Sequence, residues 1–237
     1  YLIQHSAILP ARKKEVHFFD KRYSHGEPYY RAQFPTRAEM DEASRISGEQ
    51  SVTCDATPAT MYYPFVMQRL SAMIPEARLI ALLRDPVERC FSSFRHQVRR
   101  GRETLTLENA IASESDRLSA DLLKTQKNEH YVGYNFHHFS HLSRGHYAEQ
   151  IQRMREYYPS SQILILQAET FFSEPEQVTN QVLDFLGLSP MQLDHYEKLN
   201  RGISSEMEPK VREKLQAYFE PHNEKLFEML GQRYDWS

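Results

Sequence analysis

The stretch that most constrains the fold is RLIALLRDPVERCFSSF, residues 78–94, where a buried-strand pattern leads directly into a helix start. Its first part is apolar without alternation, which is typical of a parallel strand covered on both faces. Asp85 can cap a helix, Pro86 suits the first helical position, and Glu88 lies three residues after the cap. The stretch therefore predicts a central strand that ends at Arg84 and is followed at once by a helix.

Two further segments have strand patterns, EVHFFD at 15–20 and QILILQ at 162–167. Helical spacing of apolar residues appears between and after the strands, at residues 62–73, 178–186 and 211–230, with a break predicted at Pro221. The polar segment 35–50 is interpreted as a loop or an exposed helix. Strands that alternate with helices predict an α/β domain with a central parallel sheet flanked by helices.

Composition limits the classes of partner. The chain has 237 residues, 40% of them hydrophobic, and a net charge of −3, so no strong overall field attracts nucleic acid and any anion site must be a local patch. No apolar run is long enough to span a bilayer. The two cysteines, Cys54 and Cys90, do not make a disulfide framework, which favours a reducing compartment and predicts a cytoplasmic location.

Arg84 stands at the sheet edge where open α/β folds bind their ligands. Ser92 lies seven residues after Asp85, two turns along the same helix face. An arginine and a hydroxyl beside a helix N-terminus would form a phosphate clamp. The alternative is that Arg84 pairs only with a neighbouring carboxylate, Asp85 or Glu88, and these residues alone leave both interpretations open.

Five segments, in order, resemble the sulfotransferases, specifically the heparan sulfate sulfotransferase-like group and its bacterial relatives. LLRDPVERCFSSF is similar to the family's segment for the 3′-phosphate of the donor, and the others lie at residues 13–35, 55–64, 143–175 and 200–236. The resemblance covers nearly the whole chain. It implies a single α/β domain related to P-loop nucleotide kinases, with 3′-phosphoadenosine-5′-phosphosulfate (PAPS) as co-substrate.

The resemblance also assigns donor-binding residues. Arg84 and Ser92 match positions that hold the 3′-phosphate, and Arg201 and Gly202 match a loop that closes over it, although an ordinary loop before a helix would look the same. The family's K-x-G-[ST] turn, which binds the 5′-phosphosulfate, would precede Tyr1, so the sulfotransferase domain at 1–237 is expected to be N-terminally incomplete. The stretch HYEKLNRG is short and has no cysteine, which favours the bacterial type.

On the acceptor side, a strand at 15–20 would place Glu15 and His17 on one face and Asp20 on the other. The resemblance implies that Glu15 is the catalytic base, that His17 is a second catalytic residue at the acceptor site, and that Asp20 and Thr57 contact the acceptor. The lysines at 13 and 14 would keep Glu15 ionised. The alternative is a surface Lys–Glu pair. Ala56 stands where some relatives carry a lysine, so a contact to an acidic sugar is not implied.

The sequence thus predicts a PAPS-dependent sulfotransferase that sulfates a hydroxyl, or an amine, of a carbohydrate or a carrier-bound or lipid-like acceptor, without a metal. The location would be the Golgi lumen if the source is eukaryotic. The alternatives are a nucleotide-type kinase and a non-catalytic remnant that binds 3′-phosphonucleotides or glycans. His137, His138 and His141 lie close in sequence, but neither a glutamate nor a cysteine completes a metal-ligand set.

Overall fold

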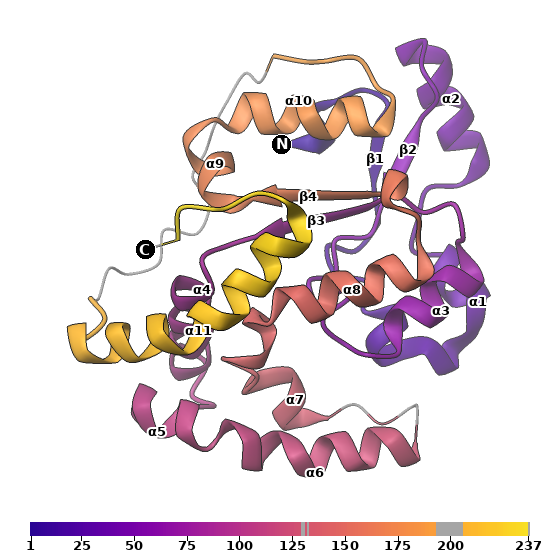
Figure 1. Cartoon of the computed structure of the whole chain (residues 1–237). Coiled ribbons are helices and arrows are strands. Elements are labelled where there is room, and N and C mark those ends of the chain that lie inside the picture. The colour runs from indigo at the N-terminus through magenta and orange to yellow at the C-terminus, as the bar shows by residue number, and fades with distance from the viewer. Residues whose placement is uncertain (129–130, 132, 193–205, 237) are drawn as a thin grey trace. The chain divides into compact units, whose positions relative to one another are not determined.

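The computed structural model describes residues 1–128, 131, 133–192 and 206–236. The chain forms two compact units. Unit 1 consists of Tyr1–Leu82 and Arg155–Glu197, and unit 2 consists of Leu83–Met154 and Lys198–Ser237. Figure 1 shows the elements of each: unit 1 carries nearly all of the strand residues, while unit 2 is built mainly from helices.

Four short strands are described. β1 (Ile8–Pro10) pairs in parallel with β2 (Val52–Cys54), and β3 (Leu79–Leu83) is the neighbour of β4 (Ile163–Gln167) in a second two-stranded sheet. The strands predicted at 78–83 and 162–167 are therefore confirmed, and so is the α/β fold class. β1 and β2 were not predicted, because three residues give too little periodicity to reveal a strand.

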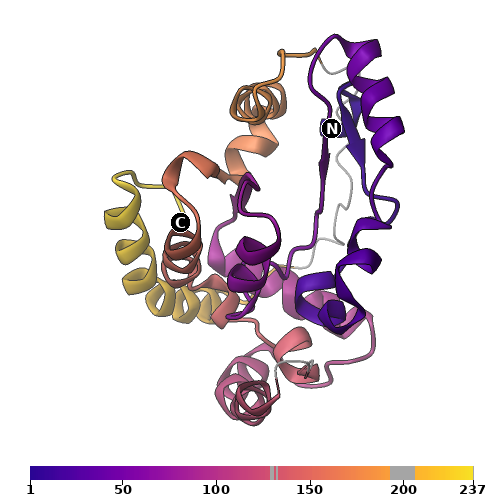
Figure 2. The same cartoon turned by 90° about the vertical axis from the view of Figure 1, so that its right-hand side faces the viewer.

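Helix α2 (Arg37–Ser47) shows that the polar segment 35–50 is an exposed helix. Thr36 accepts a hydrogen bond from the Glu39 amide while the Glu39 carboxylate accepts one from the Thr36 amide, which is a capping box. None of the helix residues is buried. Figures 1 and 2 both place α2 beside β1 and β2, within unit 1.

The core of unit 1 forms under helix α10 (Pro175–Leu186). Val178 and Val182 of this helix cluster with Leu166 of β4, while Leu183 clusters with Ala7 and Ile8 at β1. Full burial of one such aliphatic side chain contributes about 1.5–3 kcal/mol. The other helices of this unit are α1 (Gly26–Arg31), α3 (Val66–Met73) and α9 (Ala168–Ser173).

The predicted strand at 15–20 is wrong. Phe18–Arg22 forms a single π-helical turn, η2, which follows His17 in the left-handed region. A strand would turn Phe18 and Phe19 to opposite faces, whereas here both are buried and both rings contact Tyr30, at 4.8 and 4.9 Å between centroids. Burial of both rings on one side therefore outweighs the local preference for extended backbone.

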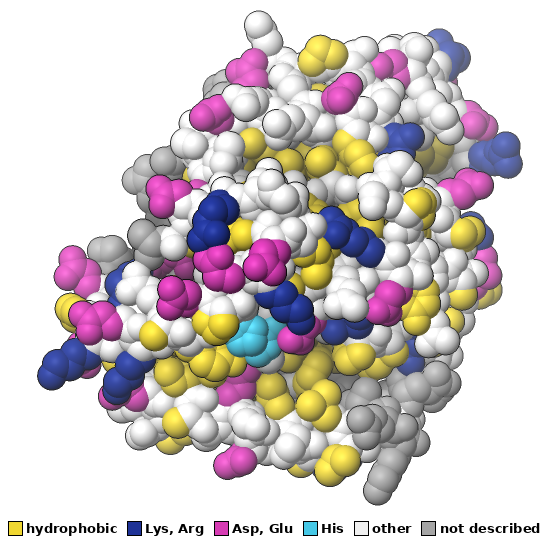
Figure 3. Space-filling view, in the orientation of Figure 1, with side chains coloured by type: hydrophobic (Ala, Val, Ile, Leu, Met, Phe, Trp, Pro, Cys, Tyr) yellow, Lys and Arg dark blue, Asp and Glu magenta, His cyan; other side chains and the backbone are white. Residues whose placement is uncertain are grey.

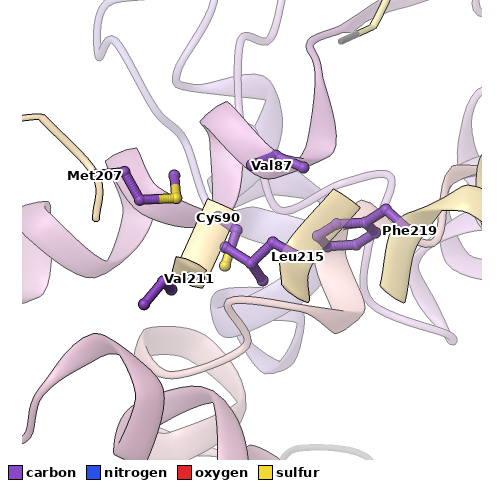
Figure 4. Packing of buried hydrophobic residues seen from close by; sticks show 6 residues of the cluster. All are labelled: Val87, Cys90, Met207, Val211, Leu215 and Phe219. Carbon is purple, nitrogen blue, oxygen red and sulfur yellow. The ribbon is translucent and has the colours of Figure 1, made fainter. Parts of the chain in front are cut away.

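Unit 2 is organised around helices α4 (Pro86–Arg99) and α11 (Pro209–Leu230). Figure 4 shows their shared cluster, which consists of Val87, Cys90, Met207, Val211, Leu215 and Phe219. Cys90 is fully buried in this cluster, so it is a core residue, as its place on the helix stripe predicted, and burial raises the pKa of its thiol to about 12. The remaining helices are α5 (Leu107–Ala112), α6 (Glu114–Lys127), α7 (Tyr134–His138) and most of α8 (Tyr147–Tyr157).

The predicted break at Pro221 is also wrong, because α11 continues through it. Proline removes the amide that would bond to the carbonyl four residues earlier, at Ala217. Pro221 and Ala217 are both exposed, so water can satisfy that carbonyl. Phe219 and Leu226 are fully buried on either side of the proline and hold both halves of the helix in place.

The Glu114 carboxylate accepts buried hydrogen bonds at the start of α6. Its carboxylate accepts hydrogen bonds from the Leu142 amide at 2.6 Å, the Ser143 amide at 2.9 Å and the Ser143 hydroxyl at 2.8 Å. The side chain is nearly inaccessible, and burial raises the pKa of the carboxyl despite these bonds. The loop at 142–143 is therefore held by one buried acceptor.

We expect Glu114→Gln to lower the free energy of unfolding by about 2 kcal/mol, because the amide NH₂ would face a backbone N–H donor with no acceptor between them. Urea denaturation followed by circular dichroism measures this. Glu213→Gln is the matched control, since Glu213 is exposed on α11 and should change stability by less than about 0.5 kcal/mol. Equal stability of the two variants would contradict the role given to Glu114.

Candidate active site

The acceptor-side residues meet around one imidazole in unit 1. His17 Nε2 lies 3.0 Å from Glu15 Oε2, and His17 Nδ1 lies 2.8 Å from Asp20 Oδ2. The Asp20 side chain is 1% exposed, the His17 side chain 15% and the Glu15 side chain 41%. The arrangement therefore runs from a buried carboxylate, through a half-buried imidazole, to a carboxylate at the surface.

Each ring nitrogen of His17 thus contacts one carboxylate. The contact with the buried Asp20 side chain fixes the orientation of the ring, and the contact with Glu15 lies toward the surface.

The turn that bears these residues is held by arginines from within unit 1. Arg69 Nη1 donates to the Phe19 carbonyl at 2.8 Å, and its guanidinium lies over the rings of Tyr23 and Phe65. Arg22 Nη1 donates to the Val16 carbonyl at 2.8 Å. The role of Arg69 is not visible in the sequence, because two of its partners, Phe19 and Tyr23, lie more than forty residues before it.

His17 is the one non-glycine residue with a positive φ in the described ranges, at φ 53° and ψ 38°. Its amide donates to Thr57 Oγ1 at 3.1 Å, and the Thr57 hydroxyl donates to Asp55 Oδ1 at 2.6 Å. Thr57 is 7% exposed. Burial raises the pKa of the Asp55 carboxyl, while hydrogen bonds from Thr57 and the Val16 amide oppose that rise.

The structure thus brings together the four predicted acceptor-side residues, Glu15, His17, Asp20 and Thr57. The predicted separation of Asp20 from Glu15 and His17 is wrong, because the turn at Phe18–Arg22 replaces the strand and returns Asp20 to the imidazole. Asp55 begins the family-like segment at residues 55–64, but no role was predicted for it. The lysines at 13 and 14 are exposed, and the partner of Glu15 is His17.

Arg84 lies in unit 2, immediately after β3 and before the helix cap Asp85, which accepts from the Val87 amide at 2.7 Å. Its guanidinium lies 3.6 Å from Glu88 Oε2, while Arg212 Nη2 lies 2.6 Å from Glu88 Oε1. The pairing with Glu88 that the sequence left open is therefore present. It is a loose contact at a half-exposed surface, and the group of three keeps one net positive charge.

A hollow of about 380 Å³ lies at this group, lined by Glu88, Phe91, Glu206, Met207 and Arg212. Ser92 is exposed, whereas its neighbour Ser93 is turned inward and contacts His141 Nδ1 at 3.0 Å. Arg212 was not predicted, although it lies ten residues after the expected donor loop. Arg201 and Gly202 lie outside the described residues.

The histidines offer a second cluster. His137 and His138 belong to α7, while His141 is fully buried, which lowers the pKa of its imidazole to about 4. His146, Glu149 and His222 place possible ligand atoms within 4.8 Å of one another. The rings of His146 and His222 are stacked 3.9 Å apart at 8°, so a cation could lie in the planes of both rings only if one ring rotated.

Figure 3 shows charges of both signs interspersed over α11.

A family model described as "Sulfotransferase family" matches residues 4–192. The chain belongs to the sulfotransferase family. The matched range contains Glu15, His17, Asp20, Thr57 and Arg84, whereas Arg212 lies beyond it. The predicted resemblance is confirmed.

Three relatives illustrate the likeness of this sulfotransferase to known proteins. A sulfotransferase structure from Alicyclobacillus acidocaldarius has a TM-score of 0.69 and 29% identity, covering 99% of this chain and 90% of that one. Heparan sulfate glucosamine 3-O-sulfotransferase 5 of Mus musculus is 25% identical over 98% of this chain and 67% of its own length. Membrane-associated sulfotransferase kil1 of Dictyostelium discoideum is 24% identical over 100% and 62%.

The sulfotransferase therefore spans about two thirds of the length of these curated relatives. The structural match covers residues of both units, which agrees with one family fold along the chain. In the described part of the chain, none of the helices has both the length and the apolar character that crossing a membrane requires.

Proposed function

We propose that this sulfotransferase moves a sulfuryl group from PAPS to a hydroxyl of a carbohydrate acceptor, with Glu15 as the general base. The observation that carries the proposal is the contact of Glu15 Oε2 with His17 Nε2, backed by Asp20 on the other ring nitrogen. One of the relatives named above is a heparan sulfate glucosamine 3-O-sulfotransferase, and this supports a sugar hydroxyl as the acceptor.

The reaction assigned to these residues is an in-line displacement. The acceptor oxygen forms a bond to sulfur as the bond from sulfur to the 5′-phosphate oxygen breaks, and 3′-phosphoadenosine 5′-phosphate (PAP) leaves. The acceptor proton passes to Glu15. Because His17 engages Oε2, the other oxygen of this partly exposed carboxylate is the one that meets the hydroxyl. Asp20 and His17 hold Glu15 at a fixed angle to the acceptor.

We assign the 3′-phosphate of the donor to Arg84, with Arg212 as a second cation and the Ser92 hydroxyl as a further donor. The guanidinium groups of both arginines already bind a carboxylate, that of Glu88, and a phosphate offers the same pair of acceptor oxygens. A bound phosphate would therefore compete with Glu88. Arg201 and Gly202 remain predicted donor contacts on the strength of the family resemblance.

Arg84→Ala is expected to weaken PAP binding about 10–100-fold while changing the affinity for adenosine 5′-phosphate less than about 2-fold, since only PAP carries the 3′-phosphate. Isothermal titration calorimetry measures both affinities. Arg99→Ala, at the carboxyl end of α4, is the control and should bind both nucleotides like the wild type. Equal losses for the two nucleotides would show that Arg84 supports the fold rather than the phosphate.

Transfer itself is tested with PAPS labelled in the sulfuryl group and a panel of acceptors: heparan sulfate, simpler glycosides, amino sugars and a lipid-linked sugar. Label recovered on a sugar hydroxyl supports the proposal, and label on nitrogen or lipid would redirect the acceptor assignment. PAP binding without any transfer would favour the non-catalytic alternative. Phosphate transfer from ATP would favour the kinase alternative and overturn the sulfotransferase assignment.

A further inference from the structure

The segment Asp55–Thr57 contacts the backbone of the acceptor-side turn at the His17 amide. This amide donates to Thr57 Oγ1 at 3.1 Å. The Thr57 hydroxyl in turn donates to Asp55 Oδ1 at 2.6 Å. The Asp55 carboxylate therefore orients the threonine that holds His17.

His17 needs such an anchor because of its backbone. An L-residue with a side chain at φ 53° is less stable than one in the right-handed region by about 1–2 kcal/mol, and this conformation persists only where neighbouring contacts enforce it. The imidazole reaches both Glu15 and Asp20 from this conformation. A return to negative φ would swing the ring away from at least one of the two carboxylates.

The hydroxyl of Thr57 has little capacity left for a ligand. Its one proton is donated to Asp55, one lone pair accepts the His17 amide, and the residue is 7% exposed. The carboxylate of Asp55 polarises this hydroxyl and makes it a stronger acceptor for the amide. These contacts favour a role toward His17 over the direct acceptor contact predicted for Thr57.

We infer that Thr57, oriented by Asp55, is a positioning residue that holds His17 in its left-handed conformation and thereby sets the angle of Glu15 toward the acceptor. This inference rests on the proposed function of Glu15. Thr57 thus acts by orienting the catalytic side chains, and groups that face the solvent bind the acceptor.

The test compares three variants in the full protein. Thr57→Val keeps the shape and removes the hydroxyl, so kcat should fall about 10–100-fold while the KM for PAPS stays within about 2-fold. Thr57→Ser restores the hydroxyl and should recover kcat to within about 3-fold of the wild type. Thr53→Val, the same exchange at an exposed position of β2, is the control and should leave both constants unchanged.

A second readout does not depend on transfer. Amide hydrogen exchange at His17, measured by NMR, should speed up about 10-fold or more in Thr57→Val and return toward the wild-type rate in Thr57→Ser, because the amide loses and regains its acceptor. If the wild type transfers no sulfuryl group, the proposed function fails while the exchange result still tests the anchor. Unchanged kcat and unchanged exchange in Thr57→Val, or no rescue by serine, would overturn the inference.

Discussion

Glu15→Gln is expected to lower kcat by about 10²–10⁴-fold, the usual contribution of a positioned general base. Glutamine has the same shape and keeps a hydrogen bond to His17, but its amide cannot accept the proton of the acceptor hydroxyl. Single-turnover transfer of labelled sulfuryl groups measures the chemical step directly. PAP affinity, measured by calorimetry, should remain within about 2-fold of the wild type, because the nucleotide site has been assigned to the Arg84 group.

Glu27→Gln supplies the control for this substitution. Glu27 is exposed on α1 and forms an ion pair with Arg31, so the variant makes the same chemical change in the same unit without touching the imidazole. It should transfer at the wild-type rate. A Glu15→Gln variant that does likewise would end the assignment of the base, and one that loses PAP affinity as well would indicate a folding defect.

Gly145→Ala is expected to lower the free energy of unfolding by about 3 kcal/mol. A Cβ atom at this position would lie 2.6 Å from Phe219 Cε1 and 3.0 Å from Pro86 Cβ. Phe219 is fully buried in the cluster between α4 and α11, so its ring has no space into which it can withdraw. The close approach of three chain segments therefore requires glycine here.

Thermal and urea denaturation of this variant measure the effect, with Gly101→Ala as the control. Gly101 has a φ of 66° and open space where the added methyl group would lie, so its substitution costs only the backbone strain of about 1 kcal/mol. Gly145 has no positive φ, so its alanine variant reports steric overlap, whereas Gly101→Ala reports backbone strain. If both lose the same stability, the packing around Phe219 is looser than the structure indicates.

The parts of the fold that follow from local signals were predictable. The strand before Arg84, the cap at Asp85 and the glycine that ends α10 each depend on residues within a few positions of one another. The turn at Phe18–Arg22 was not predictable in this way. It depends on Tyr30 and Arg69, which lie about ten and fifty positions along the chain, and a pattern search over neighbouring residues cannot include them.

The candidate site also combines features that the sequence could reveal with features that depend on residues far apart in the chain. Glu15, His17 and Asp20 were found through the family resemblance, and a strand would not have joined them; the structure supplies the turn that does. Arg212 and Asp55 were assigned no role because a lone charged residue in the sequence resembles any solvated one. Their significance appears only when Glu88 and Thr57 are seen beside them.

The aromatic residues at the end of the chain form a spectroscopic reporter. Trp236 is the single tryptophan of the protein, and its ring packs on Tyr147, Phe227 and Tyr234, all in unit 2. Tryptophan emission therefore reports only on the packing around Trp236, whereas far-ultraviolet circular dichroism averages over every helix. Comparing the two signals during denaturation shows whether the chain unfolds in one cooperative step or whether its two units unfold in succession.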